Sequence, residues 1–499
     1  MLYLLLLILL LSMTCREVLD LEQNIELQQV VYNILKMQLQ FGIYQPGERL
    51  PTMEETSRLF QVSIRTIRAA YRNLQKEGFI TVSPKVGIKV NAQYSTKDSS
   101  RYVNSFFSSR HDALLDLSCS MQPLFSKAQW LGFQNASPDL LDCMEQFAKQ
   151  KGIQPSNKII RQYQQIYGSL QNRMFMRLVW QVLMFYQAPV MGLMDFQKIT
   201  NQNPLLQMID LCRRQKWEEL RSAIETFQGQ MASGLSRFYD TQISLSSSEQ
   251  QIDFQWSGYK KASQICYSLA MDLLTGMQRG IYPAGEFLPS AEKLAKEKGV
   301  SVSTVRRTLS ILNSIGAVKS INGIGTQILS LEQIAENCDF TQPLVRTRLL
   351  DFVQSLHILT ISCKDVARIT MTSIGPADAV QLKERLRLMR RLRQYDISGY
   401  GILEMFCRLA PYRAIRTIYT ELFQQLLWGY PLRITHAEQS VMESYYLPCL
   451  DTFMEYLEKS DTNGLADKLE IFMTEELNRA IKLLDDLGIH EAAVLSIKK

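Results

Sequence analysis

The sequence predicts a mainly α-helical protein in which two small α+β modules are each followed by an all-α helical bundle. Three observations predict this fold: an internal repeat, helical periodicity over most of the chain, and two pairs of short β-prone runs. The 499 residues are 46% hydrophobic and 21% charged, which is enough apolar material for several cores. The formal net charge of +6 excludes a histone-like polycation but leaves room for local basic patches.

The internal repeat sets the organisation of the chain. The segment Gly42–Pro51 recurs as Gly280–Pro289, and Gly87 recurs as Gly325, at a constant offset of 238 residues (280 minus 42, 325 minus 87). A gap-free register over so long a stretch is hard to obtain by chance. The expected order is an apolar leader (1–23), a first module (24–92), a linker (93–110), a helical bundle (111–243), a linker (244–257), a second module (258–330) and a second bundle (331–499).

The first module has the signals of three helices and a hairpin. Periodic apolar residues predict a first helix that ends before a glycine-containing loop. Thr52 and Glu55 have the spacing of a capping box and start a second helix. Ser63 predicts the N-cap of a third helix, which ends near Gly78. Two β-prone runs within residues 79–90 predict a hairpin with a basic tip. Together these elements make a winged helix-turn-helix.

The third helix of this module separates an apolar stripe from a basic face. Its buried stripe is formed by residues at i, i+4 and i+7, namely Ile67, Tyr71 and Leu74. Its basic face is formed by Arg65, Arg68 and Arg72. Such a helix fits the DNA major groove, where arginine donates two hydrogen bonds to guanine. The groups suited to phosphate oxygens are Ser63 and Thr66 at the helix start and Lys85 and Lys89 in the wing.

The second copy keeps the scaffold and changes the surface. Its expected inner stripe is Val305, Leu309 and Leu312, and its polar groups are Ser303, Thr304, Arg306 and Arg307. Arg65 becomes Ser303 and Lys85 becomes Gly323, so the two modules are not expected to read identical half-sites. Residues 24–92 carry nine Lys/Arg and five Asp/Glu, a net of +4, and residues 258–330 carry nine and four, a net of +5. Positive charge therefore concentrates where phosphate would be met.

The combined motifs resemble the GntR family of bacterial regulators. The resemblance rests on Tyr44-x-Pro46-Gly47-Glu48-Arg49-Leu50-Pro51, Val62-Ser63-x-x-Thr66-Ile67-Arg68 and Leu74-x-x-Glu77-Gly78. It implies a double-stranded DNA operator as partner, with contacts from Ser63, Arg65, Thr66, Arg68 and Gly87, and from Ser301, Ser303, Thr304, Arg306 and Gly325 in the second copy. The chain departs from the family at Glu54, Ile64, Glu292 and Val302, where the family often has arginine.

Two modules on one chain suggest an intramolecular pseudo-dimer, because a linker raises the effective concentration of the second module. A homo-oligomer is the alternative. The helical blocks are loosely similar to the all-α effector domains of the family, which implies an unknown small-molecule effector. Many of those domains bind a metal through an Asp and three His. The four histidines here do not have ligand spacing within one block, so no metal and no cofactor is expected.

No catalytic residue is expected, because the sequence has no glycine-rich phosphate loop, nucleophile elbow or metal cluster. An aminotransferase-like domain, carried by some members of the family, would need a large α/β region that the helical blocks exclude. The nine cysteines are scattered without a C-x-x-C pair, which fits reduced thiols in a cytosolic protein. The expected location is therefore the cytoplasm, in association with the nucleoid.

The leucine-rich start, Met1–Leu11, is about half as long as a membrane span. Either the start codon is assigned too early and Met13 is the initiator, or the segment is a signal peptide or short anchor. Two alternatives to a cytoplasmic regulator follow. One is a membrane-tethered sensor that uses residues 1–12, and the other is a helical scaffold whose second module has decayed.

Overall fold

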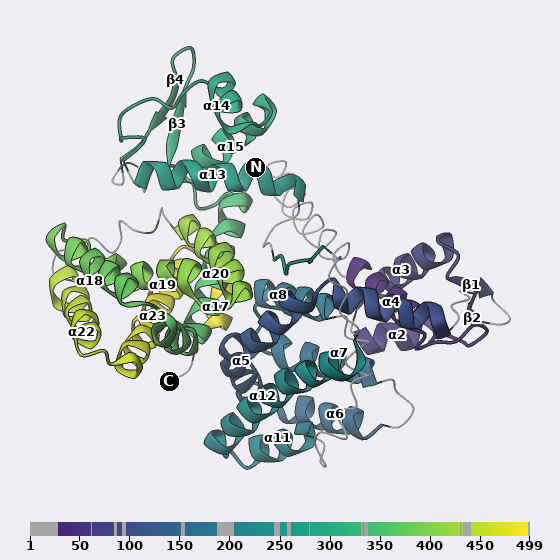
Figure 1. Ribbon diagram of the computed structural model, residues 1–499. Coiled ribbons are helices and arrows are strands. Elements are labelled where there is room, and N and C mark those ends of the chain that lie inside the picture. Colours follow the sequence, from purple (N-terminus) through teal and green to yellow (C-terminus); the bar gives the residue numbers. More distant parts are fainter. Residues whose placement is uncertain are drawn as a thin grey trace. The chain divides into compact units, whose positions relative to one another are not determined.

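The computed structural model describes residues 28–60, 62–83, 87–91, 96–150, 155–186, 204–243, 250–256, 261–278, 280–330, 333, 338–429, 432 and 441–497. Within these ranges the protein is mainly helical and contains two antiparallel two-stranded sheets, which confirms the predicted fold class (Figure 1). The chain divides into two compact units. Unit 1 comprises residues up to Gln122, Ala128–Leu170 and Met176–Phe254; unit 2 comprises Pro123–Lys127, Gln171–Phe175 and Gln255–Lys499. Each unit holds one module with a helical block.

The first module is folded as its sequence predicts. Residues 28–40 are helical and are followed by α2 (Met53–Phe60), α3 (Ile64–Lys76), β1 (Ile80–Ser83) and β2 (Gly87–Val90). The capping box at the start of α2 is formed: the Thr52 N–H donates to the Glu55 carboxylate at 2.8 Å, and the Glu55 N–H donates to Thr52 Oγ1 at 3.1 Å. Strands β1 and β2 pair with Thr81 opposite Lys89.

The second module repeats these elements at the same offset. It contains α13 (Lys261–Gln278), α14 (Ala291–Lys298), α15 (Val302–Ser314), β3 (Val318–Ile321) and β4 (Gly325–Ile328). One expectation was wrong: Leu309 is half-buried, and the inner face of α15 is instead Val305, Thr308, Ile311 and Leu312. On this face the Thr308 hydroxyl donates to the Cys266 carbonyl of α13 at 3.1 Å.

The first helical block contains α4 (Thr96–Ser108), α5 (His111–Gln134), α6 (Pro138–Lys149), α7 (Pro155–Gly168), α8 (Arg173–Phe185), α11 (Pro204–Arg213) and α12 (Trp217–Gln242). Helix α4 occupies most of the expected linker 93–110. Its Phe107 is buried, with ring centroids 4.9 Å from Phe238 and 5.7 Å from Tyr239 of α12. The serine content of this stretch concealed the apolar residues that hold it on the block.

The second helical block is built on two long helices, α17 (Pro343–Ser373) and α23 (Thr462–Asp486), which pack along each other. Around them lie α18 (Pro376–Arg391), α19 (Ser398–Leu409), α20 (Arg413–Gln425) and α22 (Leu447–Glu458), with short turns at Tyr395–Ile397, Met442–Tyr446 and His490–Leu495.

Three further expectations concern the leader and second linker, a membrane-spanning segment and a metal site. Residues 1–27 and 244–249, which include the leader and part of the second linker, lie outside the described residues. None of the helices described is both long enough and apolar enough to cross a membrane. In the same described ranges, no group of three or more His, Cys, Asp or Glu side chains is placed to hold a metal ion.

Candidate DNA interface and helical-block cavity

The start and end of α3 are fixed by local hydrogen bonds. Ser63 Oγ accepts a hydrogen bond from the Thr66 N–H at 3.1 Å, so it is the N-cap that the sequence predicted. At the other end Gly78 takes a left-handed conformation, with a φ of 80°, and the Phe79 N–H donates to the Leu74 carbonyl at 3.0 Å. The helix therefore has one defined length and places its first turn at the surface.

The rotation of α3 is fixed by its buried face. Ile67, Tyr71 and Leu74 are fully buried, as predicted. The Tyr71 hydroxyl donates to the Pro51 carbonyl at 2.9 Å and lies 2.9 Å from Thr56 Oγ1 of α2. Burial raises the pKa of this phenol, so it stays neutral and holds α3 against α2. As a consequence the opposite face is exposed, and it carries Arg65, Arg68 and Arg72.

Thr66 lies elsewhere than the sequence analysis expected. It was expected to bind phosphate, but the residue is only 3% exposed. Its Oγ1 lies 2.8 Å from Ser63 Oγ, inside the N-cap. Because it is buried, this hydroxyl is placed to support the cap. Ser63 itself is exposed.

The wing of the first module adds cations beside α3. Gly87 and Lys89 of β2 are exposed, whereas Lys85 lies outside the described residues. The structure adds Arg49, which sequence reasoning missed. Arg49 forms an antiparallel bridge with Lys89, and both residues are exposed, so the two cations share one face. The repeat could have drawn attention to Arg49, because this residue is replaced by Phe287 in the second copy.

In the second module, one of the two arginines on the recognition helix α15 is paired with a carboxylate. Ser301 caps α15, and its Oγ lies 2.8 Å from both Ser303 Oγ and Thr304 Oγ1. Arg306 and Arg307 are exposed. The Arg306 guanidinium lies 3.4 Å from the Glu292 carboxylate of α14. The pKa of Glu292 is lowered, first by its own backbone N–H at the start of α14 and also by Ser290 and Arg306, so this carboxylate is ionised at neutral pH.

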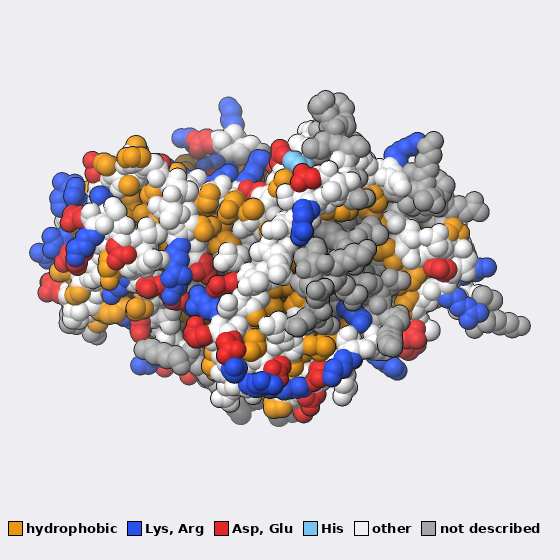
Figure 2. Space-filling model, turned by 60° about the horizontal axis from the view of Figure 1, so that its bottom comes forward, with side chains coloured by type: hydrophobic (Ala, Val, Ile, Leu, Met, Phe, Trp, Pro, Cys, Tyr) orange, Lys and Arg blue, Asp and Glu red, His pale blue; other side chains and the backbone are white. Residues whose placement is uncertain are grey.

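The wings of the two modules differ in charge at matched positions. Arg49, Lys85 and Lys89 of the first copy correspond to Phe287, Gly323 and Gln327 of the second. The net charge of the second module comes largely from elsewhere, since Lys293, Lys296 and Lys298 lie on α14. Figure 2 shows that basic and acidic side chains intermingle on the face it presents, so net charge alone does not locate an interface.

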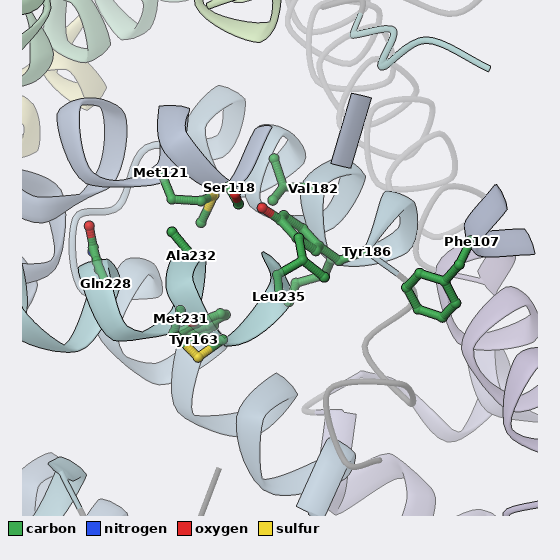
Figure 3. A pocket seen from close by; sticks show the side chains of 11 residues that line it. Phe107, Ser118, Met121, Tyr163, Val182, Tyr186, Gln228, Met231, Ala232 and Leu235 are labelled. Carbon is green, nitrogen blue, oxygen red and sulfur yellow. The ribbon is translucent and has the colours of Figure 1, made fainter. Parts of the chain in front are cut away.

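A cavity with a mainly apolar lining lies within the first helical block. Helices α4, α5, α7, α8 and α12 supply most of its lining, and Figure 3 shows their side chains around one common space. The lining consists of Phe107, Ser118, Met121, Tyr163, Val182, Leu183, Tyr186, Gln228, Met231, Ala232 and Leu235. None of these side chains is ionic at neutral pH, and burial raises the pKa of Tyr163 to about 12 and that of Tyr186 well above its ordinary value.

Helix α7 connects this cavity to the first module. Tyr163 of α7 lines the cavity. One residue further on, Gln164 donates from Nε2 to the Phe60 carbonyl at 2.6 Å, and Arg161 donates to the Leu59 carbonyl at 3.4 Å. Phe60 and Leu59 are at the C-terminal end of α2, where carbonyls have no partner within their own helix. The same short stretch of α7 therefore touches both the cavity and the helix on which α3 packs.

Comparison with known proteins gives a family for the two modules. Residues 27–90 and residues 262–328 each match the family described as bacterial regulatory proteins, gntR family. A curated relative is the uncharacterised HTH-type transcriptional regulator YdcR of Escherichia coli K12, which is 37% identical over 59 residues. That match covers 12% of this chain and 13% of the relative. This chain thus aligns with only a small part of YdcR.

Several solved structures align with somewhat less than half of the chain. Streptococcus agalactiae GntR is 14% identical, with 43% of this chain and 99% of that chain covered and a TM-score of 0.21. Escherichia coli McbR/YncC is 16% identical, with 45% and 99% covered and a TM-score of 0.23. Listeria monocytogenes Lar is 18% identical, with 45% and 99% covered and a TM-score of 0.23.

Proposed function

Because both modules of this chain belong to the gntR family of bacterial regulatory proteins, we propose that the protein is a sequence-specific DNA-binding transcription regulator that uses both modules. The observation that carries the proposal is the fixed orientation of α3, whose buried face leaves Arg65, Arg68 and Arg72 exposed on one side of a capped helix. Arginines held in this way can reach base edges in the major groove. The relatives are regulators, and no catalytic role is proposed.

The proposed contacts differ in kind along each module. In the first, Arg65, Arg68 and Arg72 face the bases, while Ser63, Gly87, Lys85, Lys89 and the added Arg49 face the phosphates. Thr66 supports the cap from inside. In the second, Arg306 and Arg307 face the bases, and Ser301, Ser303, Thr304 and Gly325 form the polar surroundings. The first module therefore supplies most of the phosphate neutralisation.

The two modules act as an intramolecular pseudo-dimer on an operator with unequal half-sites. A covalent connection makes binding of the second module intramolecular and raises its effective concentration. Unequal half-sites follow from the different side chains at positions 65 and 303, an arginine and a serine.

Selection from random-sequence duplexes by the purified full chain tests this function directly. We expect an enriched sequence with two dissimilar halves, bound by one chain as measured from the mass of the complex. Two chains on one duplex would contradict the pseudo-dimer while leaving DNA binding intact. Binding without salt dependence, or no enrichment at all, would instead favour a helical scaffold.

The small-molecule effector of the proposed regulator binds in the cavity of the first helical block. An uncharged lining does not repay the desolvation of an ionic ligand, so the fitting ligand is neutral and mainly apolar. Among the described residues, the Tyr163 and Tyr186 hydroxyls have no hydrogen-bond partner. Both residues are nine-tenths buried, and these hydroxyls are suited to one polar group on the ligand.

Occupation of the cavity reaches the first module through α7. A ligand that moves Tyr163 also moves Gln164, and with it the hydrogen bond to the end of α2. Since α3 is held on α2 through Tyr71, a shift of α2 changes the presentation of the arginines. The coupling free energy for such a change is typically about 1–3 kcal/mol.

A cavity-filling substitution tests this regulation without knowing the ligand. Ala232→Phe places a ring in the cavity and should change the affinity for the selected duplex, whereas Ser236→Phe, at an exposed position one turn along α12, should not. Adding Gln164→Ala should reduce the effect of Ala232→Phe, because it removes the hydrogen bond from α7 to α2. Equal DNA affinity for wild type and Ala232→Phe would contradict the proposed coupling.

A further inference from the structure

We propose that the wing of the second module contacts DNA through apolar side chains, Ile324 at its tip and Phe287 beside it, where the first module uses cations. The proposal rests on the DNA-binding function proposed above. It assigns the second module a contact that depends on shape and apolar surface and is therefore weakly sensitive to salt.

Ile324 is presented at the tip of a tight hairpin. Strands β3 and β4 pair with Ile321 opposite Gly325, and the Ile324 N–H donates to the Ile321 carbonyl at 3.1 Å. Gly323 and Gly325 on either side have φ values of 75° and 150°, which a residue with a Cβ rarely adopts. The two glycines therefore hold Ile324 outward, and it is 69% exposed.

Phe287 continues the same apolar surface. It forms an antiparallel bridge with Gln327 of β4, in the register that Arg49 and Lys89 use in the first module. Its ring covers Gly325, because a Cβ at that glycine would lie 3.2 Å from the ring. Phe287 is 46% exposed in spite of this contact. A phenylalanine and an isoleucine thus flank Gly325 at the surface of the wing.

Charge on this wing is low at the positions where the first wing is basic. Phe287, Gly323 and Gln327 stand where the first module has an arginine and two lysines. One exposed cation is gained: Lys319 of β3, opposite Gln327, stands where the first module has Thr81. A wing with this composition neutralises few phosphates. Apolar side chains can instead enter the minor groove, where they contact sugars or wedge between base steps.

The size and position of the patch favour DNA over a protein partner. A stable protein interface buries about 800 Å² on each side, whereas even a large aromatic side chain buries only about 150–250 Å². Two side chains are therefore too few for a protein interface but enough for a wedge. The patch also lies on the hairpin that directly follows the recognition helix, where the Ala317 N–H, just before β3, donates to the Leu312 carbonyl of α15 at 2.9 Å.

Substitutions at Ile324 test the proposal on the full chain, with a duplex selected by that chain as the probe. Ile324→Ala should weaken binding about fivefold with an unchanged dependence on salt, because it removes apolar surface and no charge. Ile324→Asp should weaken binding further by repulsion from phosphate. Ile324→Lys should bind more tightly in dilute salt and steepen the slope of log K against log salt by about 0.9. Ile265→Lys, an exposed isoleucine on α13 behind α15, is the matched control for added charge.

The outcomes distinguish a failure of the apolar wing contact from a failure of the DNA-binding function. If wild type binds the selected duplex and all three Ile324 variants bind with the same affinity and salt slope, the wing does not lie on DNA and the inference is overturned. A protein partner would then account for the exposed patch. If wild type binds no duplex, the DNA-binding function fails together with the inference that rests on it.

Discussion

Arg306 of α15 lies 3.4 Å from Glu292 of α14, whereas the equivalent residues of the first module, Arg68 and Glu54, form no ion pair among the described residues. Both members of the pair are well exposed, so the pair contributes little to stability. Its consequence lies in recognition. The pair holds one arginine of the second module toward α14 and places a negative charge beside the face that would meet DNA.

Removing this carboxylate should strengthen DNA binding. Glu292→Gln frees Arg306 and removes an ion that phosphate repels, so the affinity for the selected duplex should rise by less than about fivefold, the scale of one exposed pair. The measurement is equilibrium binding by fluorescence anisotropy in dilute salt. Glu54→Gln is the control, because it removes a charge without releasing an arginine, and a gain as large as that of Glu292→Gln would contradict a role for the pair.

Arginine removal should affect the two modules unequally. Arg68→Ala should weaken binding by about 1–3 kcal/mol if the side chain contacts a base, since one bidentate contact has that value. Arg306→Ala should cost less, because Arg306 gives up its contact with Glu292 when it binds. Selection of new duplexes by each variant shows whether preference is lost at one half of the site. An unchanged affinity for Arg68→Ala would remove this residue from the interface.

The two helix caps should stabilise their own helices independently. Ser63→Ala removes the acceptor for the Thr66 N–H, and Ser301→Ala removes the acceptor for the Thr304 N–H. Loss of an N-cap costs about 1 kcal/mol, which is roughly a fivefold faster amide exchange in the first turn. Hydrogen exchange read by mass spectrometry should show the change in α3 for the first variant and in α15 for the second. Slowed or unchanged exchange in both helices would contradict the capping role.

The repeat allowed much of the fold to be predicted. A capping box at Thr52 and Glu55, the Ser63 cap and the Gly78 stop are local signals that depend on neighbouring residues only, and the structure contains each of them. The Ser63 cap and the Gly78 stop return in the second copy as Ser301 and Gly316, whereas Glu55 is replaced by Lys293 and Ser290 alone caps α14. The fixed offset is why the order of elements in the second copy could be predicted.

Long-range contacts were the part that sequence could not supply. The serine-rich composition predicts a linker where α4 lies, because the burial of Phe107 depends on α12, which is distant in sequence. The inner face of α15 includes Thr308 in place of Leu309, and the Thr308 hydroxyl there meets the Cys266 carbonyl of α13, which is distant in sequence. The cavity is formed by side chains from several helices that no local motif marks.

Stability of the second unit should fall in mild acid because of His357. Its ring is buried, its Nδ1 lies 3.1 Å from Asn172 Nδ2, and burial, together with Lys127, lowers its pKa from 6.5 to about 4. The unfolded chain binds a proton below pH 6.5, whereas the folded chain does so only near pH 4. The stabilisation is therefore complete above pH 6.5 and is lost as the pH falls toward 4, by up to about 3 kcal/mol.

The variant His357→Gln isolates this contribution, since it keeps a polar side chain without a titrating ring. Urea unfolding at pH 7 and at pH 4.5 should show a smaller loss of stability in acid for the variant than for wild type. Equal losses for the two proteins would assign the acid sensitivity to other groups.

The dependence of DNA affinity on salt tests the central claim most directly, because it reports whether exposed cations of the modules meet phosphates. For the full chain on a duplex that it has selected, log K should fall linearly with log salt, and the affinity should drop at least about tenfold between about 50 and 200 mM. Removing Arg49 and Lys89 together should make the slope shallower by nearly two. A chain that prefers no duplex to a neutral polymer, even in dilute salt, would contradict the account.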